Sequence, residues 1–115
     1  MIKCGEYKHY KEKYYTVYGL AVDNKNEEFV LYQQNYGDKK FWIRPAHMFM
    51  EKIIINGQTV QRFELLKQIS EEIAMINLAN ILKIQNIDIL HSETEQRYKI
   101  VSLDIESKNI KVIPF

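Results

Sequence analysis

Short strand-like segments separated by tight turns fill the first 64 residues, and this spacing constrains the fold most. Residues 14–23 and 28–36 are rich in Tyr, Val and Leu, and the polar residues between them predict a hairpin. Asn56-Gly57 predicts another hairpin, because both residues tolerate positive φ in a two-residue turn. Residues 5–10 and 41–44 predict two more strands, the second ended by Pro45. Antiparallel strands this close together favour a small β-barrel or sandwich.

Residues 70–85 change to a helical period. Ser70 is a suitable N-cap, and the two acidic residues that follow it complement the helix dipole. Asn77, Asn80 and Lys83 form one narrow polar stripe, and the rest of the circumference is apolar. We therefore expect this helix to pack against the barrel and against a second surface. That surface is either the C-terminal strands or a second protomer.

Residues 86–115 return to strand patterns, with turns near 94–95 and 107–108. The whole chain is therefore predicted to be mainly β (α+β overall). We expect residues 1–64 to form one domain. Residues 65–115 are expected to form an appended helix and C-terminal strands, packed on the first part as one unit.

The composition limits the classes of function. The chain has 115 residues, with 16 Lys+Arg against 15 Asp+Glu. A formal charge of +1 makes nucleic acid a disfavoured partner, because such binders usually carry a basic excess. A single cysteine, Cys4, with neither a leader nor a membrane span in the sequence, predicts a cytoplasmic protein without a membrane partner.

Several motifs in the first half are shared with a known family. They are GEYKHYK at 5–11, YGD at 36–38, WIRP at 42–45 and NGQTVQRF at 56–63. In this order and spacing the chain resembles the bacterial domain of unknown function 1653 family. The resemblance implies a compact SH3-like β-barrel over residues 1–64, and it implies no biochemical activity.

The chain departs from this family at one turn. After Ala21 the family tends to carry a His-Ser-Glu-Thr type turn, whereas here Val22 is followed by Asp-Asn-Lys-Asn in a shorter turn. The resemblance does not extend to the helix or the final strands. Together these observations predict a small SH3-like barrel followed by one helix and a C-terminal β-hairpin.

Trp42 and Arg44 form the first candidate binding pair. Residues two apart in a strand point to the same face. A guanidinium beside an indole offers donors and a stacking surface for a carboxylate, a phosphate or a base. The alternative is structural: the Arg44 side chain stacks on an aromatic ring and pairs with Glu51 to close the barrel.

The second candidate group is Tyr7, His9 and Lys11, which share one face of the first predicted strand. Phenol, imidazole and ammonium groups together suit an anion. With Tyr36 stacking beside Trp42, we expect a non-catalytic module for a small anionic or nucleotide-like ligand. The alternative for the first strand is an edge kept polar to prevent unwanted pairing.

Two further functions stay open. One is a small hydrolase or nucleotide-modifying enzyme that uses His9 and Glu51. The other is an assembly or interaction module that dimerises through the 70–85 helix. The sequence predicts no metal site, because His9, His47 and His91 lack zinc-motif spacing. It predicts no bound cofactor either, since no glycine-rich phosphate loop precedes a helix.

Overall fold

The computed structural model describes residues 2–115, which contain ten strands and two helices. The strands are β1 (Gly5–His9), β2 (Lys13–Val22), β3 (Glu28–Gln34), β4 (Phe41–Pro45), β5 (Lys52–Ile55), β6 (Gln58–Gln61), β7 (Phe63–Gln68), β8 (Ile89–His91), β9 (Arg97–Asp104) and β10 (Asn109–Pro114). The helices are the single turn α1 (Ala46–Phe49) and the longer α2 (Glu71–Ile84). Neither of these helices is long and apolar enough to span a bilayer.

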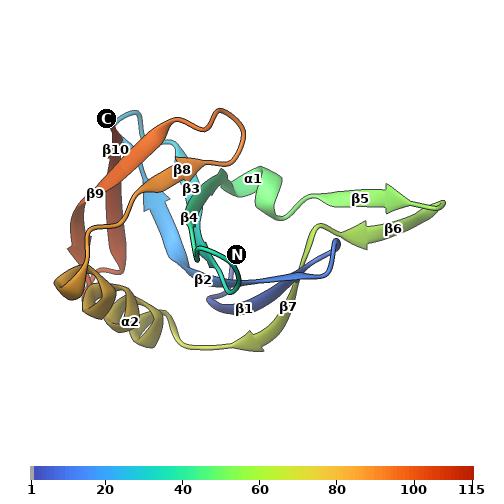
Figure 1. The fold of residues 1–115 in the computed structure, drawn as a ribbon, viewed down its shortest axis with the longest axis horizontal. Coiled ribbons are helices and arrows are strands. Elements are labelled where there is room, and N and C mark those ends of the chain that lie inside the picture. Colours follow the sequence, from blue (N-terminus) through green and yellow to red (C-terminus); the bar gives the residue numbers. More distant parts are fainter. Residues whose placement is uncertain (1) are drawn as a thin grey trace.

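Six strands close a barrel in the order β2, β3, β4, β8, β9 and β10 (Figure 1). The strand β8 pairs parallel with β4, and β10 pairs parallel with β2, where Ile110 lies opposite Ala21. The C-terminal strands thus complete a ring that the first half of the chain begins. The predicted mainly β fold, with a barrel, one main helix and a C-terminal hairpin, is confirmed.

The helix α2 contributes to the core of this barrel. Its N-cap is Ser70, whose hydroxyl oxygen accepts a hydrogen bond from the Ile73 amide at 3.1 Å, so the helix begins where predicted. Ala74, Met75 and Leu78 are buried together with the inward residues of the barrel strands. Burial of a large side chain such as Met75 or Leu78 contributes about 1.5–3 kcal/mol.

A second apolar cluster lies on the other face of β3. Side chains alternate between the two faces of a strand, so Phe29 and Leu31 point into the barrel while Val30 and Tyr32 join the second cluster. The other members of that cluster come from β1, β2, α1 and β7. The two clusters explain why four consecutive residues of β3 are buried.

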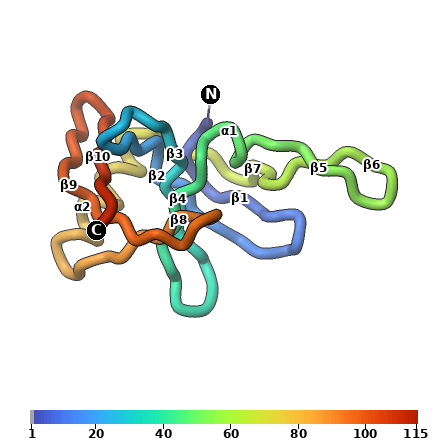
Figure 2. Tube along the Cα trace, turned by 90° about the horizontal axis from the view of Figure 1, so that it is seen from above, coloured from blue at the N-terminus to red at the C-terminus, as the bar shows by residue number. Residues whose placement is uncertain are grey.

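The hairpin of β5 and β6, residues 52–61, projects from the body and is called the arm below (Figures 1 and 2). It forms a two-stranded sheet of its own. Its turn is the predicted Asn56-Gly57, with φ of 50° and 78°. The molecule measures 43 × 28 × 27 Å, and the arm extends along the longest axis (Figure 1).

Candidate functional site

Arg44 is engaged by other protein groups. Its side chain is only 15% exposed, and its guanidinium lies 3.4 Å from the Glu93 carboxylate. The Nε–H donates to the Tyr32 hydroxyl at 3.3 Å, and the guanidinium carbon lies 5.6 Å from the centre of the Phe63 ring. Its ionic partner is therefore Glu93 and not Glu51. The corner after β4 thus has a structural role that joins the C-terminal strands to the first half of the chain.

Trp42 and Tyr36 are also held by neighbours. The Trp42 indole N–H donates to Gln34 Oε1 at 2.8 Å. The Tyr36 hydroxyl shares a hydrogen bond of 2.8 Å with the Tyr15 hydroxyl, and their rings meet edge to face. Within residues 2–115, neither Trp42 nor Tyr36 lines either of the two cavities described next.

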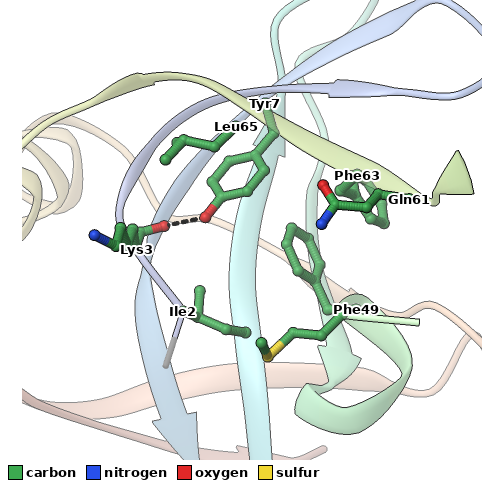
Figure 3. A pocket seen from close by; sticks show the side chains of 8 residues that line it. Ile2, Lys3, Tyr7, Phe49, Gln61, Phe63 and Leu65 are labelled. Carbon is green, nitrogen blue, oxygen red and sulfur yellow. Dashed lines mark hydrogen bonds between the residues drawn. The ribbon is translucent and has the colours of Figure 1, made fainter. Parts of the chain in front are cut away.

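Tyr7 lines the first of these cavities, the aromatic cavity, of about 200 Å³ (Figure 3). Its lining residues are Ile2, Lys3, Tyr7, Phe49, Met50, Gln61, Phe63 and Leu65. The Phe49 and Phe63 rings stack 4.1 Å apart and form one wall. The Tyr7 hydroxyl donates to the Lys3 carbonyl at 2.5 Å, and the Lys3 ammonium points away from the cavity (Figure 3). The interior is therefore mainly apolar.

His9 lines the second, the His9 groove, of about 530 Å³. The groove runs between the β1–β2 turn and the arm, and its lining residues are Lys8, His9, Tyr10, Glu12, Ile55, Thr59, Val60, Gln61 and Glu64. The His9 ring packs 4.5 Å from the Tyr10 ring and 4.9 Å from the Phe63 ring. Its volume falls within the usual range of small-molecule sites, roughly 300–1,000 Å³.

The surroundings of His9 are electropositive. Burial, the largest cause, and the positive charges of Arg62, Arg44 and Lys11, in that order, together lower the pKa of His9 to about 4. The ring is therefore neutral at pH 7. Its Nδ1 accepts a hydrogen bond from the Lys11 amide at 3.2 Å, which places the proton on Nε2 as a free donor.

Two further cationic side chains lie beside the groove. The Lys11 ammonium lies 5.7 Å from the centre of the Tyr10 ring, and the Arg62 guanidinium lies 6.0 Å from it. Arg62 also pairs with Glu51 at 3.1 Å. Its Nε is buried without a hydrogen-bond partner among the residues that the structure describes. The structure thus gathers His9, Tyr10, Lys11 and Arg62 at one place.

The residues considered for catalysis, His9 with Glu51 and Cys4, are poorly arranged for it. Glu51, the expected partner of His9 in an enzyme, is already paired with Arg62. Burial raises the pKa of the Cys4 thiol to about 11, so this residue is a poor nucleophile at neutral pH. Across residues 2–115, no three His, Cys, Asp or Glu side chains lie close enough together to hold a metal ion.

Glu93, Tyr10 and Arg62 are not among the site residues predicted from the sequence. No local signal pointed to Glu93, because it lies within residues 91–94, outside the residues that the family motifs cover and far along the chain from Arg44. The buried His91 accepts hydrogen bonds at Nδ1 from the amides of Glu93 and Thr94, at 3.1 and 3.3 Å. These bonds shape the turn that carries Glu93.

Comparisons with known proteins agree with the resemblance seen in the sequence. The model of a family described as protein of unknown function (DUF1653) matches residues 5–65. A crystal structure of a DUF1653 protein from Bordetella bronchiseptica is 24% identical, with a TM-score of 0.54. The similarity covers 60% of this chain and 92% of that one. Comparison with the curated proteins found no match.

Proposed function

Because the chain belongs to DUF1653, a family without an assigned activity, we propose its function from the site: non-catalytic binding of a small anionic or nucleotide-like ligand. The binding site is the His9 groove. The proposed ligand class is the one expected from the sequence, but the proposed binding site lies at His9 and not at Trp42 and Arg44. Those two side chains already have protein partners.

One observation carries the proposal: three cationic side chains lie near a neutral imidazole beside a half-buried aromatic ring, in a groove of ligand size. A positive potential in a partly enclosed site attracts anions and raises their local concentration. Of the two carboxylates that line the groove, Glu12 pairs with Lys8 at 3.4 Å, while Glu64 opposes an anion. We therefore place the anion on the His9 side of the groove, beside Lys11.

Each group has a role that its chemistry suits. The Tyr10 ring offers a face on which a base or other planar ring stacks. Lys11 meets the charge of the anion, and the His9 Nε2–H donates a hydrogen bond to it. Arg62, which pairs with Glu51, adds to the positive potential but does not contact the anion. Ile55 and Val60 of the arm provide the apolar wall opposite.

Titration with adenosine monophosphate and with inorganic phosphate tests the proposal. NMR signals of the His9 and Tyr10 rings should shift on addition of the nucleotide, with weaker effects of phosphate because it cannot stack. Lys11→Gln should weaken nucleotide binding about ten- to a hundredfold, since a charge-assisted hydrogen bond is worth roughly 1.5–3 kcal/mol. Arg97→Gln is the control, because Arg97 lies on β9, is 59% exposed and pairs with Asp88, away from the groove.

The proposal fails if neither compound perturbs the His9 and Tyr10 signals. It also fails if Lys11→Gln and Arg97→Gln reduce affinity equally, because binding would then depend only on overall charge. His9→Gln gives a further check on the position of the site. This variant should weaken binding while leaving the fold intact, since the His9 ring is partly open to water.

A further inference from the structure

The arm exposes more apolar surface than a solvated hairpin needs. Ile54 is 73% exposed and Ile55 is 40% exposed, and Met50 at the base of the arm is 55% exposed. Ile54 and Ile55 are consecutive in β5, so the arm exposes apolar surface on both of its faces. Ile54 does not line the His9 groove, so it plays no part in the proposed ligand site.

The strands of the arm are short, at four residues each, but the arm has little other protection against pairing. Its ten residues, 52–61, contain one charged residue, Lys52, and no proline. Edge strands that avoid pairing normally carry charges, prolines or bulges. A lone two-stranded hairpin is marginally stable in water, so pairing with further strands stabilises it.

The aromatic cavity lies at the base of the arm. The aromatic cavity opens beside Met50 and Gln61, and its volume is about 200 Å³. That is below the range of roughly 300–1,000 Å³ typical of small-molecule pockets, and the lining is mainly apolar. One chain thus carries an exposed isoleucine near the tip of the arm and an apolar cavity at its base.

We infer that two copies of this chain form a dimer by laying their arms side by side in opposite directions. Each strand of the arm has four residues, or about 14 Å at roughly 3.4 Å per residue. Full overlap therefore brings each tip to the base of the other arm, so that Ile54 covers the aromatic cavity of the partner. The arrangement has two-fold symmetry and buries the same surface on both copies.

The single charge on the arm favours this direction of pairing. Lys52 lies at the base, so in an antiparallel pair each Lys52 meets the uncharged tip of the other arm, Asn56-Gly57. A parallel pair would place the two lysines opposite each other, which is destabilising. The free edges of the two arms would then form one four-stranded antiparallel sheet.

The α2 helix, the dimer surface expected from the sequence, provides the competing outcome. Its Ala74, Met75 and Leu78 are buried in the barrel of the same chain, while Ile73 and Ile84 are 53% and 83% exposed. Sedimentation velocity over a range of concentrations should show a dimer for the natural chain. Ile54→Arg should shift it to monomer, and the control Ile84→Arg should leave the dimer intact.

A cross-link tests the arrangement directly. Protein carrying Ile54→Cys is mixed with protein carrying Met50→Cys and oxidised; the expected product is a disulfide-linked dimer of the two. Cys4 does not compete, because it is buried and its pKa is raised to about 11. A monomer at every concentration overturns the inference. A dimer that Ile84→Arg dissociates, or that Ile54→Arg leaves intact, also overturns it.

Discussion

Lowering the pH from 7 towards 4 should destabilise this protein through His9. The pKa of this ring falls from 6.5 to about 4 on folding, because it is partly buried and faces Arg62, Arg44 and Lys11. Between these two values the unfolded chain binds a proton that the folded chain does not. The contribution of His9 to the free energy of unfolding is therefore fully present above about pH 6.5 and is lost as the pH falls towards 4.

The magnitude follows from the size of this change. One pKa unit corresponds to about 1.4 kcal/mol, so the full change from 6.5 to about 4 corresponds to about 3 kcal/mol. His9 is partly open to water, and screening reduces the expected loss to about 1–2 kcal/mol. Binding of an anion in the groove should raise the pKa of His9 and recover part of this loss.

Two measurements check this prediction. NMR titration of the histidine rings should give His9 a midpoint near pH 4. Urea unfolding at pH 7 and pH 5 should show a smaller loss of unfolding free energy on acidification for His9→Gln than for the natural chain. A His9 midpoint near 6.5, with equal pH dependence of the two proteins, would refute the reasoning.

Three further predictions concern the packing around the site. Phe49→Ala should reduce the free energy of unfolding by about 3–5 kcal/mol in urea denaturation, because Phe49 is 2% exposed in the second apolar cluster; a loss below about 1 kcal/mol would contradict this packing. Gly5→Ala should lower the thermal midpoint far more than Gly57→Ala. A Cβ at Gly5 would collide with the Lys67 carbonyl oxygen, whereas a Cβ at Gly57 has nothing within 4 Å. Equal shifts of the two midpoints would count against this close approach of β1 and β7. Glu93→Gln should cost about 1 kcal/mol in urea denaturation by removing the partner of a largely buried guanidinium, against about 0–0.5 kcal/mol for Asp88→Asn in an exposed pair. The reverse order would show that Glu93 does not stabilise the barrel.

The sequence by itself determined the local structure. Asn56-Gly57 specified a hairpin because both residues accept positive φ, and Ser70 specified the start of α2 because its hydroxyl caps a free amide. Alternation along β4 placed Trp42 and Arg44 on one face. These features depend on neighbours a few residues apart, so they can be read directly from the chain. The family motifs, at residues 5–63, predicted a barrel, but the ring closes only with β8, β9 and β10 beyond them.

Only the tertiary structure decided what the candidate side chains contact. Arg44 meets Glu93, which lies far along the chain, because β8 pairs with β4. The His9 groove needs the β1–β2 turn and the arm together, and no local pattern shows that they face each other. The physical reason is that strand periodicity specifies which face a side chain occupies. The strand that covers this face depends on pairings between distant segments.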